Sequence, residues 1–567
     1  MTFLIVDQLY IIQWHTRDGY FSPIMTDSET WTPRCSIEEA DRILTTPGNL
    51  LEIETRIIDG RVLKVWKNLW PSLRHLFLHS TKEHADKTCI VYEKERYTFR
   101  DILDKAVKCA AIFKDLYGIK KGDRVVICSH NCPNYLVVFW ACHLLGAVTA
   151  FVNISLPLEP LRHCVTLTKC ALIVLDTERA DGIESIGADL MLASGASGYL
   201  VLEDHEGKGY WEGMDIWSTV FAGYRAPKEI DDPQISPEDD ATITFTSGTT
   251  GLPKGVLSSQ RAFLTPLFDL ISLAGRDCVR RGLLSQTPLI LSAVTCALQG
   301  HKVVLTRTWN IHEVVELCQA ENIIRLGGPP SIIRVLAESA ISRTSIKHIL
   351  CGGAPLAASH LRRFKQAFPR ATFVQLYGLT EMNAAAAGFA GSDYDAKPDS
   401  CGWVFPVGEV MIMKDDVKAA PGVLGEIWLR GPNVMKGYYG DKAATDKVLT
   451  KDGWLMTGDL GRMDEDGCVY ITDRIKDIVI RDGYSVDSVF VENTLYTEPG
   501  VLETAVVGVP DEHAGELPVA LVTLRPAYNG LIDEEKLIAT AKKLLPSYAI
   551  PVMIILHDRN FGEYLIA

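Results

Sequence analysis

The chain has 567 residues, of which 47% are hydrophobic, and it carries a formal net charge of −14 at pH 7. This length predicts two or more domains, and the acidic balance excludes a nucleic-acid surface, which requires clustered lysine and arginine. The 14 cysteines form neither a Cys-x-x-Cys pair nor a cluster with zinc spacing. We therefore expect buried, reduced thiols, with no disulfide and no structural zinc.

The N-terminal residues 1–46 show little periodicity, and we expect them to form an extension. Residues 3–14 are apolar, but Asp7 interrupts them and no basic segment precedes them, so they predict no signal peptide. Residues 135–152 are the most apolar stretch of the chain, yet they contain a histidine and a glycine and follow a turn signal. They predict a buried helix that runs into a strand, not a membrane span.

From about Tyr97 the sequence alternates short β-branched runs with amphipathic stretches, which is typical of parallel sheets with crossover helices. Ile311, Val314, Val315 and Cys318 recur at helical spacing and predict the apolar face of a helix. The fold class is therefore α/β. The expected strands cover residues 125–128, 147–152, 171–175, 302–305, 346–350 and 372–375.

After about Gly425 the expected strands become shorter, as at residues 425–430 and 467–472, and they end at the charged stretch 473–477. We interpret this charged stretch as a hinge. The residues beyond it predict a compact α+β unit. Its expected elements are strands at 478–480, 504–509 and 519–524 and helices near 489–496 and 534–545.

Residues 243–256 predict a loop that binds a polyphosphate. Glycines let the backbone turn with its N–H groups inward, hydroxyls add donors, and a lysine adds a mobile positive charge. Gly255, not Ser or Thr, follows Lys254, which excludes a Walker A loop. The alternative, a plain surface turn, does not require this combination of residues. The candidate ligands are Thr246, Ser247, Gly248, Thr249, Thr250, Gly251 and Lys254.

Three later segments predict further parts of a nucleotide site, although each alone is also compatible with a turn or a cap. Gly353, Ala354 and Pro355 follow an expected strand, where small residues leave a flat slot for a purine ring. Residues 377–381 also follow an expected strand. They offer an aromatic face at Tyr377, then Gly378, a hydroxyl at Thr380 and a carboxylate at Glu381 that is suited to Mg²⁺.

The last of these segments is Thr457-Gly458-Asp459. It places a carboxylate after a glycine turn, where Asp459 can accept hydrogen bonds from both hydroxyls of a ribose. Arg474 follows at the expected hinge.

In this order on one chain, the four segments resemble the adenylate-forming superfamily of acyl-CoA synthetases, firefly-type luciferases and carrier-protein adenylation domains. The resemblance covers the chain from about Trp70 to Pro551. It implies a large N-terminal domain of several subdomains and a small, mobile α+β C-terminal domain, for which we expect residues 47–475 and 476–567. It also implies that a carboxylic acid and ATP form an acyl-adenylate and pyrophosphate with Mg²⁺, and that coenzyme A then captures the acyl group.

The resemblance further implies roles for matching positions. The phosphate loop falls on residues 246–254, and the adenine slot falls on residues 353–355 with the stacking Tyr377. Thr380 would contact phosphate, and Glu381 would hold magnesium. Asp459 and Arg474 would bind the ribose, Lys476 would sit at the hinge, and Gly483 would approach the thiol channel after the small domain rotates.

The chain departs from the family in two places. Family members carry a C-terminal Gly-Lys whose lysine bridges the substrate carboxylate and the α-phosphate, whereas Lys543 is the last lysine here. Family members also carry an aromatic-His pair after Pro-Leu that lines the acyl pocket, whereas this chain continues from Pro288-Leu289 into Ile290-Leu291-Ser292. The first departure predicts slow adenylation, because one such donor contributes about a hundred- to a thousand-fold in rate. The second predicts an altered acid pocket.

The leading hypothesis is an ATP-dependent acyl- or aryl-CoA ligase whose partners are a small carboxylic acid, ATP and CoA. The alternative is a catalytically weakened protein that binds a nucleotide or an acyl-adenylate. An adenylation partner for a carrier protein is disfavoured, because no carrier-like serine motif follows the C-terminal unit. Alanines at 384–387 leave room for an acid, although alanines are also helix formers. The terminal Leu-Ile-Ala is not a peroxisomal Ser-Lys-Leu signal, so we expect a cytoplasmic protein.

Overall fold

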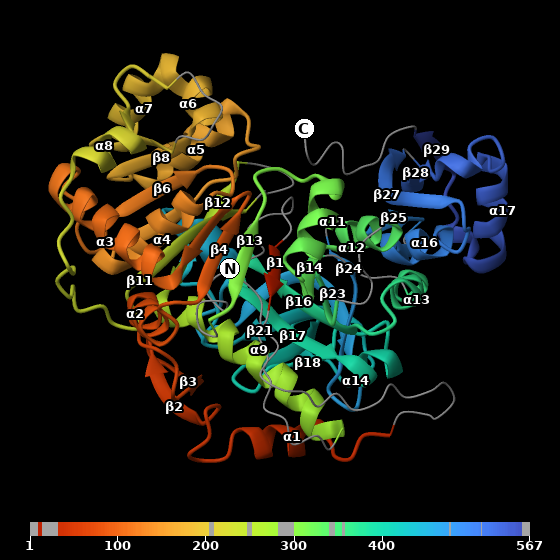
Figure 1. The fold of residues 1–567 in the computed structure, drawn as a ribbon. Helices are drawn as coiled ribbons and strands as arrows, with labels where there is room; N and C mark the ends of the chain where they lie inside the picture. The colour runs from red at the N-terminus through yellow and green to blue at the C-terminus, as the bar shows by residue number, and fades with distance from the viewer. Residues whose placement is uncertain are drawn as a thin grey trace.

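The structure is a computed structural model that describes residues 10–13, 32–202, 209–246, 252–281, 300–339, 346–353, 358–475, 478–482, 484–511 and 513–557. Within these ranges the protein has a mixed α/β architecture, with a large N-terminal domain and a small C-terminal domain (Figure 1). No helix in the described ranges is long and apolar enough to cross a membrane.

An eight-stranded sheet forms one half of the large domain. Its strands run parallel from β10 to β11, and β12 and β22 extend it in antiparallel fashion. Alternate residues of a strand face opposite sides, so Val125 and Ile127 pack under helices α2–α4, whereas Val126 and Cys128 pack under α5–α7. In sheet order the strands are β10 (Asp215–Ile216), β9 (Tyr199–Leu202), β8 (Leu172–Asp176), β6 (Arg124–Cys128), β7 (Val148–Phe151), β11 (Asp240–Thr246), β12 (Lys254–Ser259) and β22 (Gly437–Tyr438). The helices are α2 (Leu73–Glu83), α3 (Phe99–Leu116), α4 (Pro133–Leu145), α5 (Leu158–Thr168), α6 (Thr177–Ile183), α7 (Gly187–Ser194) and α8 (Trp217–Gly223).

Helix α4 and strand β7 are the buried helix and strand expected at residues 135–152. Pro133 occupies the first turn of α4, and Gly146 ends the helix with φ of +70°. Both positions match the preferences of helix ends. His143 is fully buried in α4, its Nε2 lies 3.0 Å from the Thr149 hydroxyl, and burial lowers its pKa to about 3. This histidine is therefore neutral and part of the core.

A nine-stranded sheet forms the other half. One apolar cluster joins it to helices α11–α13, and a second joins its opposite face to α9 through Leu270 and Leu273. In sheet order the strands are β18 (Trp403–Val404), β17 (Ala384–Ala390), β16 (Thr372–Leu379), β15 (His348–Gly352), β14 (Arg325–Gly328), β1 (Tyr10–Gln13), β13 (Lys302–Leu305), β4 (Thr88–Tyr92) and β5 (Glu95–Thr98). The helices are α9 (Gln260–Arg281), α11 (Ile311–Ala320), α12 (Pro330–Glu338), α13 (Ala358–Ala367) and α14 (Gly391–Ala396).

Parts of the expected N-terminal extension contact the large domain. Strand β1 lies antiparallel between β13 and β14. Helix α1 (Ile37–Leu44) packs on α9, where the Arg276 guanidinium donates to both oxygens of Asp41 at 2.6 and 2.7 Å. A bidentate pair of this kind fixes the relative orientation of the two helices.

A five-stranded antiparallel sheet and a separate hairpin complete the large domain. The sheet packs on Tyr377 of β16 and on Met382 of the turn between β16 and β17, which brings late strands next to this turn. In sheet order its strands are β20 (Val417–Lys418), β19 (Glu409–Lys414), β21 (Gly425–Arg430), β23 (Leu455–Met463) and β24 (Val469–Arg474). The hairpin pairs β2 (Ile53–Ile58) with β3 (Arg61–Trp66), and α15 (Lys442–Val448) precedes β23.

The small domain is the blue unit of Figure 1, which lies beside α12 and α13. Its apolar core joins one sheet to helices α16 and α17. Asp473, at the end of β24, is buried and accepts hydrogen bonds from the backbone N–H and the hydroxyl of Ser488 at 2.8 and 2.7 Å. Its strands are β25 (Val479–Arg481), β26 (Tyr484–Val486), β27 (Val501–Asp511), β28 (Gly515–Leu524) and β29 (Met553–His557), and its helices are α16 (Ser488–Leu495) and α17 (Glu534–Leu544).

Most of the expected elements are confirmed, with ends shifted by a few residues. The strands at 302–305 and 425–430 are β13 and β21, and the four apolar residues at helical spacing lie on α11. Two local expectations are wrong. Tyr377 and Gly378 lie inside β16 and not after it, and Asp459 lies inside β23 and not after a turn. The alanines at 384–387 form strand β17, so the alternative that they form a helix does not hold. In each case pairing with a neighbouring strand extends the element beyond the local signal.

Candidate functional site

The expected phosphate loop connects two antiparallel strands. Thr246 ends β11 and pairs with Lys254, which begins β12, and the Thr246 hydroxyl lies 3.4 Å from the Lys254 carbonyl oxygen. A side chain at Gly255 would place its Cβ 2.8 Å from Ile243, so the strands approach too closely for another residue. The predicted ligands between these strands, Ser247, Gly248, Thr249, Thr250 and Gly251, lie outside the described residues.

Lys254 and Glu381 meet at one tyrosine. The Lys254 Nζ lies 4.9 Å from the ring centroid of Tyr438, and the Tyr438 hydroxyl donates a hydrogen bond to Glu381 Oε1 at 2.7 Å. Tyr438 is placed there because β22 pairs with β12, so that Tyr438 lies opposite Val256. Sequence reasoning missed Tyr438, since the only signal is a pair of aromatic residues after Gly437.

Thr380 and Glu381 lie on a short 3₁₀ turn, Thr380–Met382, between β16 and β17. Asn383 closes the turn with φ of +60°, and its side-chain amide donates to the Asn433 carbonyl at 2.9 Å. The Glu381 carbonyl accepts from Met435 N at 2.8 Å. These bonds fix the backbone of the turn, so the Glu381 carboxylate is held near Tyr438.

Gly378 is a glycine because of a close backbone approach. A Cβ built at this position would lie 1.7 Å from the Ala384 carbonyl oxygen, at the irregularity where β16 changes register with β17. Gly378 does not have a positive φ. Space, not backbone conformation, therefore excludes a side chain here.

We predict that Gly378→Ala lowers the free energy of unfolding by about 1–3 kcal/mol or more, the usual cost of overpacking. Gly328→Ala is the matched control, because Gly328 is a strand glycine of the same sheet and its nearest neighbour lies 3.6 Å from a built Cβ. The control should change stability by less than about 0.5 kcal/mol. Denaturant unfolding measures both, and equal losses in the two variants would contradict the steric explanation.

Tyr377, Asp459 and Arg474 form a second cluster. The buried Tyr377 hydroxyl donates to Asp459 Oδ2 at 2.6 Å, and the Arg474 Nε lies 3.4 Å from Asp459 Oδ1. Arg474 is opposite Asp459 in the β23–β24 pair. Burial raises the pKa of the Asp459 carboxyl, while the Tyr377 hydrogen bond and the Arg474 charge act in the opposite direction.

From this cluster we predict that Tyr377→Phe shifts the pH dependence of ATP binding. Removing the hydroxyl removes a group that lowers the pKa of Asp459, so that pKa rises further. A carboxylate must be ionised to accept two ribose hydrogen bonds, and nucleotide binding should therefore be lost at a higher pH on the acidic side. Measuring ATP affinity at several acidic pH values gives the midpoint pH at which binding is lost.

Tyr470→Phe is the control for this prediction. Tyr470, on β24, donates to Asp464 at 3.1 Å, so the two residues form another tyrosine–aspartate pair near Asp459 and Arg474 in the sequence. The Tyr470→Phe substitution should leave the midpoint pH for loss of ATP binding unchanged. A Tyr377→Phe midpoint at or below that of the parent protein would contradict the assigned role of the hydroxyl.

Gly353 is the described residue of the expected adenine slot. It follows β15 with φ of +84°, and no atom of the described residues lies within 4 Å of a built Cβ. Ala354, Pro355, Lys476 and Gly483 lie outside the described residues, as do residues 288–292 of the expected acid pocket and the C-terminal residues 558–567.

The residues around Glu381 fit a magnesium ion. Mg²⁺ prefers oxygen ligands and is commonly held by one or two carboxylates together with substrate phosphates. Glu381 is partly exposed, and within the described part of the chain its carboxylate makes one hydrogen bond, to Tyr438, and no ion pair. One carboxylate oxygen of Glu381 is therefore available as a metal ligand next to Tyr438, whose ring Lys254 also contacts.

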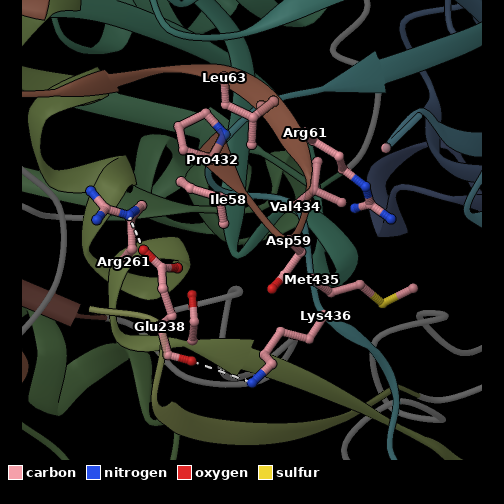
Figure 2. Close-up of a pocket in the computed structure, with 13 residues that line it drawn as sticks. Ile58, Asp59, Arg61, Leu63, Glu238, Arg261, Pro432, Val434, Met435 and Lys436 are labelled. Carbon is pink, nitrogen blue, oxygen red and sulfur yellow. Dashed lines mark hydrogen bonds and ion pairs between the residues drawn. The ribbon is translucent and has the colours of Figure 1, made fainter. Parts of the chain in front are cut away.

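A separate cavity lies between the β2–β3 hairpin and the β12–β22 edge (Figure 2). Its volume is about 90 Å³, and none of the predicted site residues lines it. Two of its charged side chains are in ion pairs, because Arg261 contacts Glu238 at 2.7 Å and Lys436 contacts Asp240 at 2.5 Å. We regard this small cavity as a packing feature.

Comparison with known proteins gives consistent results. The AMP-binding enzyme family matches residues 77–439, and the AMP-binding enzyme C-terminal domain matches residues 491–559. The chain is 30% identical to a feruloyl-CoA synthase from Amycolatopsis sp, over 86% of this chain and 94% of that protein. It is 29% identical to 4-coumarate–CoA ligase 1 from Arabidopsis thaliana, over 79% and 83%. The o-succinylbenzoate CoA synthetase from Bacillus subtilis, solved with its acyl-adenylate, shares the fold with a TM-score of 0.70 at 24% identity, over 86% of this chain and 95% of that one.

The fold matches that of adenylate-forming enzymes, and the chain belongs to the AMP-binding enzyme family. Within this family it is an AMP-forming acid–thiol ligase, as its CoA-ligase relatives are. The comparisons do not favour the alternative of a binding protein without ligase activity.

Proposed function

We propose that the chain activates an aromatic carboxylic acid, and that the two clusters around Tyr438 and Asp459 hold the two ends of ATP. The observation that supports this arrangement is the spacing of Tyr377 and Glu381. These residues are four positions apart on one continuous segment, so the ribose cluster and the phosphate cluster are at most about 14 Å apart along the chain.

In this proposal each residue type meets the part of ATP that it suits. Lys254 and the loop 246–251 bind the phosphates, together with the Thr380 hydroxyl. The slot at 353–355 and the ring of Tyr377 take the adenine, while Asp459 and Arg474 bind the ribose. Glu381 holds Mg²⁺, which would supply charge neutralisation on the phosphates when bound.

The reaction then has two steps. A carboxylate oxygen of the acid forms a bond to the α-phosphorus, and the bond from that phosphorus to the bridging oxygen of the β-phosphate breaks, releasing pyrophosphate. Lys254 lowers the repulsion between the incoming carboxylate and the triphosphate. In the second step the thiol sulfur of CoA attacks the acyl carbon, AMP leaves, and the thiol gives up its proton.

The proposed domain division places residues 47–475 in the large domain and 476–567 in the small one, with residues 1–46 as an extension. Two features support it. The five-stranded sheet ends with Arg474, and the small domain has an apolar core of its own that begins at Val479. Lys476 would allow the rotation, and Gly483 would reach the thiol channel in the second step.

The proposed acid class rests on the relatives named above, whose names identify hydroxycinnamate-type substrates, and on the small side chains of β17. Ala385, Ala386 and Ala387 are buried in the strand that pairs with β16, which carries Tyr377.

The test supplies the full chain with ATP, Mg²⁺, CoA and two matched acid panels, one aromatic and one aliphatic. AMP and thioester formation with aromatic acids is the expected result. A preference for aliphatic acids would contradict the proposed acid class.

A further inference from the structure

A cavity of about 360 Å³ lies where the small domain meets helices α12 and α13. Figure 1 shows these helices beside the blue C-terminal unit. Three arginines line the cavity, with Arg334 from α12, Arg363 from α13 and Arg525 from the end of β28. None of the residues assigned to the nucleotide site lines it.

Two of these arginines cross the interface in ion pairs. Arg334 donates to Glu503 at 2.5 Å and also to the Leu502 carbonyl, and Arg525 donates to Glu338 at 2.7 Å. Each pair joins a residue of the large domain to a residue of the small domain. The two pairs balance their own charges and leave the third arginine unbalanced.

Arg363 is that third cation. Among the residues that the structure describes, its guanidinium has no hydrogen bond and no ion pair. Burial lowers its pKa, and so does the positive charge of Arg525. Three guanidinium groups and two carboxylates leave the cavity with a net charge of about +1.

The two paired arginines also have unused donors. The Nε–H groups of Arg334 and Arg525 are buried and have no hydrogen-bond partner within the described ranges. A buried donor without a partner typically costs about 1–3 kcal/mol. A compact anion with several acceptor oxygens could satisfy donors of this kind, and arginine is well suited to phosphate.

We propose that this interdomain cavity binds a phosphate group, and that the bound group holds the small domain against α12 and α13. The ligand is either an inorganic anion or the phosphate ester of an aromatic compound, since the rings of Phe364 and Tyr528 also line the cavity. The site is distinct from the ATP site, and it acts on the orientation of the domains and not on the chemistry.

The binding test uses calorimetry on the full chain with two probes, inorganic phosphate and phenyl phosphate. Arg363→Gln removes the unpaired cation without leaving a carboxylate unpaired. Arg362→Gln is the control, because Arg362 is the exposed neighbour on the same helix and does not line the cavity. Saturable binding by the parent and by Arg362→Gln, weakened at least about tenfold in Arg363→Gln, is expected. Tighter binding of phenyl phosphate would identify an organic ester as the ligand, and tighter binding of phosphate an inorganic anion.

Two results would overturn the site. One is the absence of saturable binding of both probes. The other is equal binding by the two variants, which would place the phosphate elsewhere, such as the predicted loop at Lys254. Thermal unfolding confirms that both variants are folded.

The orientation claim has its own measurement. Trypsin cleaves after lysine and arginine, and the expected hinge at 473–477 contains both. Phosphate should slow cleavage there in the parent and in Arg362→Gln, and not in Arg363→Gln. Binding that depends on Arg363 but leaves the cleavage rate unchanged would overturn the claim that the ligand holds the domain.

Discussion

Glu381→Gln should reduce pyrophosphate release about a hundred- to a thousand-fold, the usual loss when one charge-stabilising group of an active site is removed. Gln keeps the shape of the side chain and still accepts the hydrogen bond that Tyr438 now donates at 2.7 Å. The fold should therefore be retained, and only the negative charge is lost. Because Mg²⁺ binds carboxylate oxygens more strongly than amide oxygens, the variant should also require more Mg²⁺ for half-maximal rate.

Tyr438→Phe is the control for this result. It removes the hydrogen bond to Glu381 but keeps the carboxylate and the ring that lies 4.9 Å from Lys254. Loss of one hydrogen bond costs about 0.5–1.5 kcal/mol, or roughly two- to tenfold in rate. If Tyr438→Phe lowered the rate of pyrophosphate release as much as Glu381→Gln, the function of the Glu381 carboxylate would depend on the hydrogen bond from Tyr438 that orients it. A Glu381→Gln rate within a few-fold of the parent rate would refute the magnesium role.

Much of the fold follows from patterns that are local in the sequence. Continuous β-branched runs such as residues 125–128 and 302–305 are buried on both faces, and their composition alone predicts a strand. Lys254, Glu381 and Asp459 are likewise predicted from glycine-rich or hydroxyl-rich segments, and Arg474 from the charged stretch that follows them. The hydrophobic pattern of a segment and the kinds of side chains that it carries can both be read from a single sequence.

The features that the sequence did not predict come from contacts between distant segments. Tyr438 meets Lys254 only because β22 pairs with β12, and nothing next to Tyr438 in the sequence indicates that neighbour. The alanines of β17 have no preference for a strand, and they form one because they pair with β16. The interdomain arginine cavity joins residues that lie more than 150 positions apart, at Arg334 and Glu503.

Adding the missing C-terminal lysine should raise the rate of adenylation about a hundred- to a thousand-fold. Lys543, on α17, is the last lysine of the sequence. The variant replaces residues 558–567 with a tail that ends in Pro-x-x-x-x-Gly-Lys. The matched control carries the same tail with alanine in place of the lysine, so the two differ by one side chain.

Measuring the two half-reactions separately distinguishes the role of the added lysine in adenylation from a general effect of the new tail. Pyrophosphate release from acid and ATP should rise with the lysine tail and not with the alanine tail. Thioester formation from a supplied aryl-adenylate and CoA should be similar in all three proteins, because the bond to the α-phosphorus has already formed. Equal pyrophosphate release by the parent and the lysine variant would mean that another group of this chain, such as Lys254 beside Tyr438, already balances the charge of the reacting carboxylate.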